Sequence, residues 1–219
     1  MNHFSLKAVF IMVTCVDHNR LDLFHKPARI LIFGLSGAGK SYLVSKIVRK
    51  YHKKFDNIIS IGSDLEKVDG LVQRDDSYDF ENKDRNEKIL LIFDDSLYRK
   101  SLMEKACKAF IHGRPLNISS IFISQSLFVN DNLFRIISLN VTHIILLTIR
   151  NIKSLKLYSK SFLPEESIDS FLSLYKHLVL DNIDHKHLLI DFSKPFPSVI
   201  SFRSNIASED GSYEETFTI

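Results

Sequence analysis

The chain has 219 residues, of which 45% are hydrophobic and 25% are charged, and its formal net charge is +3. This length and apolar content are sufficient for one sizeable core, so we expect a single domain with small appendages. The charge balance is too mild to indicate nucleic-acid binding by itself, which would need a local basic patch. The two cysteines, Cys15 and Cys107, lack the spacing of a metal site, and this usage fits a reducing compartment.

The first part of the chain contains an apolar run at residues 8–16. Lys7 before this run gives it some likeness to a signal peptide, but a buried strand accounts for the same residues and is the expectation here. No stretch of about 18 apolar residues occurs, so the sequence predicts no transmembrane helix and no membrane partner. We treat residues 1–26 as an N-terminal extension.

Residues 34–41 match the phosphate-binding pattern G-x-x-x-x-G-K-[ST]. In this pattern the glycines let backbone N–H groups converge on phosphate oxygens, and the following helix adds its positive end. A buried strand expected at residues 30–33 and helical apolar spacing after the loop favour this interpretation over an unrelated glycine turn. The residues expected to bind ATP are Gly34, Leu35, Ser36, Gly37, Ala38, Gly39, Lys40 and Ser41. Lys40 is expected to contact the β- and γ-phosphates, and the Ser41 hydroxyl to bind Mg²⁺.

A basic run at residues 49–54 ends the helix that follows this loop. Such a run is either a solvated helix end or a contact with a phosphate backbone. Residues 57–61 are predicted to form the second strand. Residues 62–87 are polar and charged with few apolar positions, so we expect a mobile insert there.

Five consecutive apolar residues at 89–93 lead into Asp94 and Asp95. A buried parallel strand that ends in carboxylates is typical of a Walker B element, because ligands in open α/β sheets bind where the strands end. Asp94 is expected to hold Mg²⁺, and Asp95 to orient or deprotonate the attacking water. Two helix-capping aspartates are the alternative.

A helix with one apolar stripe is predicted at residues 98–112, and Gly113 ends it. The next strand, at residues 118–124, delivers Gln125 to the same edge as Asp94. An amide at this place can sense the γ-phosphate through a hydrogen bond, although a glutamine at a strand end is common without any such role.

The remaining chain continues the alternation of helices and strands. We expect a short helix around residues 133–137, a strand at 142–148 and two helices within 151–180, the second opened by Pro164. Residues 188–191 and 199–202 are candidate edge strands that would pair as a hairpin. The acidic tail at residues 205–219 has few core residues, so we expect it to be disordered.

The segment of residues 110–128 closely resembles a signature of the viral genome-packaging ATPases in the FtsK and HerA superfamily. The likeness lies in Gly113-Arg114 with the following Asn-Ile-Ser, and in Ser124-Gln125 with the following Ser-Leu-Phe. It extends over about residues 27–204 and is nearest to the Polinton (Maverick), adintovirus and virophage type, with poxvirus packaging ATPases more distant. Two departures are Pro115 in place of the usual histidine, and Asn151 where the family often has aspartate.

The resemblance implies a homo-oligomeric ring that hydrolyses ATP and pumps double-stranded DNA into a capsid through a capsid or portal vertex protein. It also implies an arginine that reaches the active site of the neighbouring subunit. Arg114 is the candidate for this arginine and Arg150 is the reserve, while pairing of Arg114 with a surface carboxylate is the alternative. An intracellular location, nuclear or cytoplasmic at the site of virus assembly, is implied as well, and not secretion.

Together these features predict an α/β fold of three layers, a RecA-like P-loop NTPase of the additional-strand class with a central, mainly parallel sheet. The ATPase domain is expected to span residues 27–204. Two other functions stay open from the sequence: a P-loop nucleoside or small-molecule kinase, and an inactive nucleotide-binding remnant of a mobile element.

Overall fold

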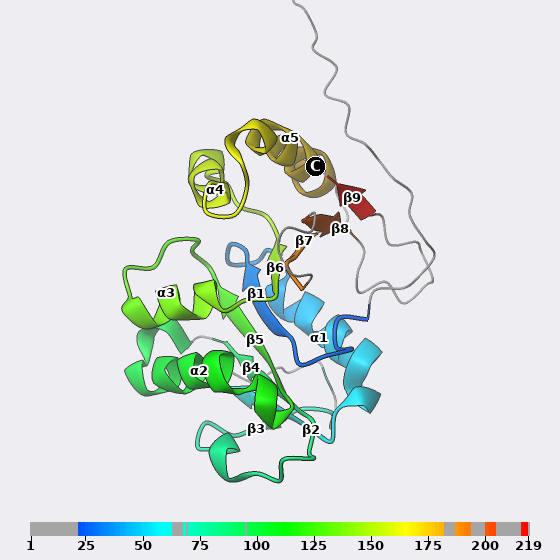
Figure 1. The fold of residues 1–219 in the computed structure, drawn as a ribbon, viewed down its shortest axis with the longest axis vertical. Helices are drawn as coiled ribbons and strands as arrows, with labels where there is room; N and C mark the ends of the chain where they lie inside the picture. Colours follow the sequence, from blue (N-terminus) through cyan, green and yellow to red (C-terminus); the bar gives the residue numbers. More distant parts are fainter. Residues whose placement is uncertain are drawn as a thin grey trace, which may run out of the picture.

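The computed structural model describes residues 22–62, 68, 70–94, 96–181, 187–193, 200–204 and 216–218. For residues 216–218 it describes the backbone alone. The strand predicted at residues 8–16 and the predicted catalytic Asp95 lie outside these residues. Figure 1 shows a central sheet with helices on both faces. The fold is therefore the three-layer α/β arrangement that the sequence predicts.

The sheet has nine strands in the order β3-β2-β4-β5-β1-β6-β7-β8-β9. The first six in this order are parallel and the last three pair antiparallel. Their bounds are β1 Arg29–Phe33, β2 Asn57–Ile61, β3 Gln73–Arg74, β4 Ile89–Phe93, β5 Ile118–Ser124, β6 His143–Leu146, β7 Leu188–Asp191, β8 Ser201–Arg203 and β9 Thr216–Thr218. Strand β5 lies between the P-loop strand β1 and the acidic strand β4, which is the arrangement of the additional-strand class.

The described helices cover both faces of the sheet but are divided unequally between them (Figure 1). Helix α1 (Lys40–Tyr51) packs alone, whereas α2 (Lys100–His112), α3 (Asn132–Leu139), α4 (Ile152–Ser159) and α5 (Glu165–Tyr175) share the opposite side. The alternation of side chains along β1 follows this division. Ile30 and Ile32 belong to the core under α1, and Leu31 and Phe33 belong to the core under the other helices.

Most sequence predictions for the regular elements are confirmed. The strands at residues 57–61 and 118–124 have the predicted bounds. The pair at residues 188–191 and 201–203 forms the predicted antiparallel hairpin, although neither strand is an edge, because β7 lies against β6 and β8 lies against β9. Helix α5 begins directly after Pro164, as predicted.

Two predictions of disorder differ from the structure. In the tract 62–87, residues 70–87 carry β3 and a 3-10 helix, Phe80–Asn82, and Phe80 is buried in the core. The Lys105 ammonium of α2 also donates hydrogen bonds to the carbonyl oxygens of Asp76 and Tyr78, at 2.7 and 3.0 Å. In the acidic tail, residues 216–218 form β9, which pairs with β8; residues 205–215 and 219 lie outside the described part of the chain.

Candidate nucleotide-binding site

The glycine loop joins β1 to α1 at the carboxyl edge of the sheet. Gly37 and Gly39 have φ angles of +76° and +87°, in the left-handed region that glycine adopts without strain. Gly34 is required for a different reason. A methyl group on it would lie 3.0 Å from the Leu147 side chain and 3.3 Å from that of Ala38. The predicted glycines thus have a steric role in this loop, and α1 begins at Lys40 with its positive end on the loop.

The loop is anchored to the two strands that flank β1. The Gly34 N–H donates to the Ser124 carbonyl at the end of β5, and the Leu35 N–H donates to the Thr148 carbonyl after β6, at 3.2 and 3.1 Å. The Thr148 backbone is itself held by Tyr175 of α5. The Tyr175 hydroxyl donates to the Leu147 carbonyl at 2.8 Å and accepts from the Ile149 N–H at 2.7 Å.

Tyr175 is a fully buried side chain, and burial raises its pKa to about 12. It therefore stays protonated near neutral pH and can serve there as both donor and acceptor. No local sequence pattern marks Tyr175 as a residue that supports the loop. Its role in fixing the support of the glycine loop depends on where α5 packs, so sequence reasoning missed it.

The ammonium of Lys40 is folded back over the glycine loop. It donates hydrogen bonds to the carbonyl oxygens of Gly34 at 2.9 Å and Leu35 at 2.8 Å. Ser41 follows as the second residue of α1, and its side chain is exposed. Both groups therefore lie at the N-terminal end of α1, next to the glycine loop.

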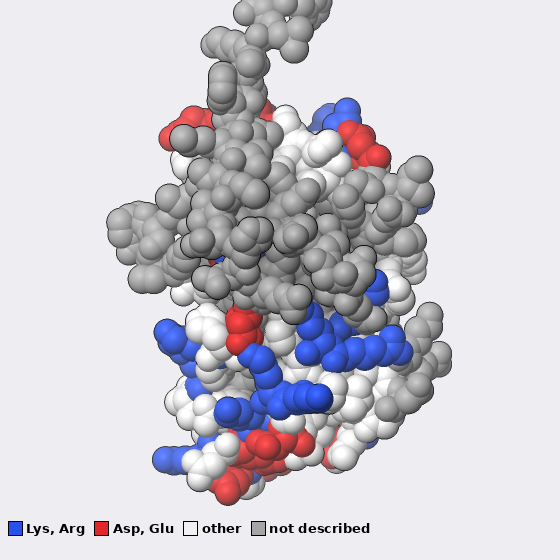
Figure 2. All heavy atoms as spheres, turned by 90° about the vertical axis from the view of Figure 1, so that its right-hand side faces the viewer, with Lys and Arg blue, Asp and Glu red and all other residues white. Residues whose placement is uncertain are grey.

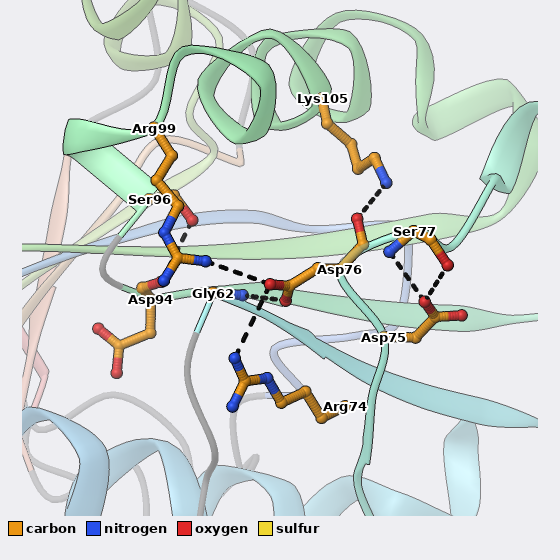
Figure 3. Close-up of polar contacts among 9 residues, drawn as sticks. All are labelled: Gly62, Arg74, Asp75, Asp76, Ser77, Asp94, Ser96, Arg99 and Lys105. Carbon is orange, nitrogen blue, oxygen red and sulfur yellow. Dashed lines mark hydrogen bonds and ion pairs between the residues drawn. The ribbon is translucent and has the colours of Figure 1, made fainter.

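Asp94 ends β4 two strands away from the glycine loop, at the same edge of the sheet. Its N–H donates to the Ile61 carbonyl at 3.1 Å, and its carbonyl accepts from the Ser96 hydroxyl at 3.2 Å. The Asp94 carboxylate is half-buried and points toward the α1 side of the sheet (Figure 3). This carboxylate and the Ser41 hydroxyl are hard oxygen donors of the kind that Mg²⁺ prefers.

A cluster centred on Asp76 supports the end of β4 (Figure 3). The Asp76 carboxylate accepts from the Gly62 N–H at 2.8 Å and from the Arg99 guanidinium at 3.2 Å, and it lies 3.8 Å from Arg74. The Gly62 α-carbon in turn lies against the Asp94 backbone, where it leaves no room for a side chain. Asp76 lies in the tract 62–87, for which the sequence predicts a mobile insert. No local pattern marks it, because β3 must pair with β2 before Asp76 reaches Gly62.

Gln125 lies at the end of β5 with its side chain exposed at the same edge. Two serines shape this turn: the Ser124 hydroxyl donates to the Ser126 carbonyl at 2.8 Å, and the Ser126 hydroxyl donates to the Phe128 carbonyl at 2.7 Å. The Gln125 amide makes no hydrogen bond to any residue in the described part of the chain. The glycine loop is hydrogen-bonded to Ser124, the residue before Gln125. The Gln125 amide is therefore available to a ligand bound beside this loop.

The two candidate arginines lie at opposite edges of the sheet. Arg150 follows β6 and is exposed at the carboxyl edge, on the side of the glycine loop. Arg114 is exposed in the short 3-10 turn Arg114–Leu116 that precedes β5, so it lies at the amino edge. Asn151, whose role the family resemblance left in doubt, caps α4 by accepting from the Ser154 N–H at 3.1 Å.

The predicted basic run is confirmed as a surface feature. Arg49 and Lys50 occupy the last turn of α1, and His52, Lys53 and Lys54 form the 3-10 helix that follows. Figure 2, which faces the α1 side of the molecule, shows lysine and arginine side chains gathered there. Across the described ranges, no helix has the length and apolar character needed to cross a membrane.

Comparison with known proteins identifies the fold. No protein-family model matches the chain, and no curated protein matches it in sequence. The genome packaging NTPase B204 from Sulfolobus turreted icosahedral virus 2, in complex with AMPPCP, is 17% identical with a TM-score of 0.51, and the match covers 80% of this chain and 96% of B204. The DNA-packaging ATPase B204 from Sulfolobus turreted icosahedral virus is 20% identical with a TM-score of 0.51, over 81% of this chain and 97% of that chain. This chain has the fold of these P-loop NTPases.

Proposed function

We propose that this chain hydrolyses ATP to ADP and phosphate and uses the cycle to move double-stranded DNA, packaging a viral or virus-like transposon genome into a capsid. The observation that carries the proposal is the convergence of the glycine loop, Asp94 and Gln125 at one edge of a sheet whose strand order is that of the additional-strand class. The solved structures with this fold include genome-packaging NTPases, one of them bound to AMPPCP. The sequence signature of residues 110–128 favours the Polinton, adintovirus and virophage type.

The residues that the sequence analysis singles out take the following roles in this proposal. The backbone N–H groups of residues 35–40, together with Lys40, hold the phosphates of ATP. Asp95, which lies outside the described residues, activates the attacking water. Gln125 senses the γ-phosphate through its exposed amide.

Ser41 and Asp94 would hold Mg²⁺. Their oxygen atoms suit this ion, and they lie at the same edge of the sheet, on α1 and after β4. A bound Mg²⁺ would neutralise charge on the phosphates of ATP. Arg114 would reach the site of a neighbouring copy within a ring, since the amino edge that carries Arg114 is remote from the glycine loop of its own chain.

The partners in this proposal are double-stranded DNA, further copies of the chain, and a capsid or portal vertex protein at the intracellular site of virus assembly. The basic residues of the α1 end offer a surface for the phosphate backbone of DNA. The side chains of Arg49, Lys53 and Lys54 are exposed, which contact with DNA would require.

The rate of phosphate release from ATP, measured with and without double-stranded DNA, tests the proposal against the kinase alternative. We expect hydrolysis that DNA stimulates and that Lys40→Ala and Asp94→Asn abolish. Transfer of the phosphate to a nucleoside, without stimulation by DNA, would instead indicate a kinase. An inactive remnant would bind ATP without releasing phosphate. Unchanged hydrolysis in an Asp95→Asn variant would remove Asp95 from the mechanism.

A further inference from the structure

Arg29 and Arg114 both lie at the amino edge of the sheet, at the start of β1 and in the turn before β5. Arg29 begins β1, and its Nη1 donates a hydrogen bond to the carbonyl oxygen of Phe110 at 3.1 Å. Phe110 lies in the last turn of α2, four residues before Arg114, and in a helical turn the backbone of residue i+4 lies beside the carbonyl of residue i. The Arg29 guanidinium is therefore anchored next to the backbone of Arg114.

No carboxylate in the described part of the chain neutralises either guanidinium. Arg29 is half-buried, and its Nε is buried without a hydrogen-bond partner. Burial lowers the pKa of Arg29, and the positive charge of Arg114 lowers it further. Two cations held together at a protein surface without an acid cost free energy, and an anionic ligand between them would remove this cost.

We propose that Arg29 and Arg114 together form an oxyanion site that takes the terminal phosphate of a nucleotide bound to the glycine loop of a second copy. This inference rests on the proposed function and adds Arg29 to it. Two guanidinium groups in the same region of the surface suit one compact phosphate with several acceptor oxygens. A DNA backbone would instead be matched by a row of cations along a groove.

The phosphate must come from another copy because of the geometry of β1. Arg29 and Phe33 are the two ends of this strand, about 13 Å apart at the usual rise per residue, and the glycine loop lies beyond Phe33. The bond to Phe110 also directs the Arg29 side chain toward α2 and away from its own loop. Arg29 is the anchored member of the pair, and Arg114 is the exposed one.

Nucleotide-dependent association of the full chain tests this site without requiring hydrolysis. Sedimentation would be measured with Mg²⁺ and a non-hydrolysable ATP analogue for Arg29→Gln, Arg114→Gln and the control Arg85→Gln. Arg85 is an exposed arginine at the same edge, before β4. We expect Arg29→Gln and Arg114→Gln each to weaken association by about 10-fold or more, the range for losing a charge-assisted hydrogen bond, while the control is unchanged. Binding of the analogue to a single copy should stay the same in all three variants.

A mixing experiment separates a role across copies from a role in folding. Arg29→Gln chains keep an intact glycine loop, and Lys40→Ala chains keep an intact Arg29. If Arg29 acts on the neighbouring copy, a mixture of the two recovers ATP hydrolysis that neither has alone. Arg29→Lys, which can keep the bond to Phe110, should keep the thermal stability of the wild type and only part of its activity.

Several outcomes would overturn the inference. These are wild-type association that does not respond to the analogue, association that Arg29→Gln leaves unchanged, or a mixture that shows no recovery although the wild-type chain hydrolyses ATP. Failure of the proposed function looks different. In that case the chain would associate on binding the analogue in an Arg29-dependent manner, but would release no phosphate in response to DNA.

Discussion

The α-carbon of Gly62 lies so close to the carbonyl oxygen of Asp94 that a methyl group on Gly62 would come within 1.9 Å of that oxygen. Gly62 follows β2 and has a φ angle of +102°, and its N–H is held by the Asp76 carboxylate. The end of the acidic strand is thus positioned by backbone packing against its neighbour. The position of Asp94, which we expect to hold Mg²⁺, depends on this contact.

Replacement of Gly62 by alanine should displace the Asp94 backbone. The clash and the positive φ together should lower the free energy of unfolding by about 3 kcal/mol, and the variant should need more Mg²⁺ for ATP hydrolysis. Urea denaturation and a Mg²⁺ titration of the hydrolysis rate measure these effects. Gly70→Ala is the matched control, because Gly70 also has a positive φ, +69°, but has open space around it. It should cost about 1 kcal/mol and leave the Mg²⁺ requirement unchanged.

Asp76→Asn should weaken the support of Gly62 and release the Arg99 guanidinium, since an amide oxygen is a weaker acceptor than a carboxylate. We expect a lower maximal rate of hydrolysis and a higher Mg²⁺ requirement, with little change in ATP affinity, because the glycine loop is anchored elsewhere. Asp75→Asn provides the control. The Asp75 carboxylate accepts hydrogen bonds from the Ser77 N–H and hydroxyl within its own turn and not from Gly62. If both variants behave alike, Asp76 has no special role.

Tyr175→Phe removes the hydroxyl that bridges the backbone on both sides of Thr148. The Ile149 N–H and the Leu147 carbonyl would then lose a buried partner, so the free energy of unfolding should fall by about 1–3 kcal/mol. ATP affinity should fall as well, because Thr148 anchors the glycine loop through Leu35. In Tyr158, the hydroxyl makes no hydrogen bond to any described residue, so Tyr158→Phe should change neither quantity. Equal effects of the two substitutions would contradict the role of Tyr175.

Stability should fall as the pH drops below neutrality. Burial lowers the pKa of both His143 and His187 to about 4, so the folded chain keeps them neutral, while the unfolded chain takes up protons below its ordinary pKa of about 6.5. The stability is therefore complete above pH 6.5 and is lost as the pH falls toward 4. The expected loss between pH 7.5 and 5 is on the order of 2 kcal/mol per histidine.

The two histidines differ in their surroundings, and this difference decides which of them to substitute. His143 lies 3.4 Å from Asp191, which favours its protonated form. The His187 Nε2 is buried with no hydrogen-bond partner among the described residues, and Lys46 opposes protonation of His187. His187→Leu should therefore make the chain less sensitive to acid in urea denaturation between pH 5 and 7.5. An unchanged pH dependence in this variant would contradict the explanation.

The sequence is most informative where local patterns alone decide the structure. Strand β4 is apolar along its whole length because both of its faces are buried, and the glycine loop is defined by backbone requirements at Gly34, Gly37 and Gly39. The support of the site follows from tertiary pairing instead. Asp76 reaches Gly62 only through the pairing of β3 with β2, and no periodicity in a charged tract predicts this.

The C-terminal strand illustrates the same limit. Residues 216–218 lie in an acidic tail with little apolar content, and they form a strand by pairing with the backbone of β8, for which no hydrophobic pattern is needed. Composition therefore predicted disorder for a segment that completes the sheet. The anchoring of Arg29 by the Phe110 carbonyl is a further contact that only the packed fold brings about.

Displacement of a third strand from a DNA triplex on addition of ATP is the most direct test of the central claim, because it measures movement along duplex DNA. The full wild-type chain should displace the third strand with ATP and Mg²⁺, but not with a non-hydrolysable analogue. The Asp94→Asn chain should not displace it under either condition. Steady hydrolysis of ATP without displacement of the third strand, by a chain that is assembled on the DNA, would contradict the account.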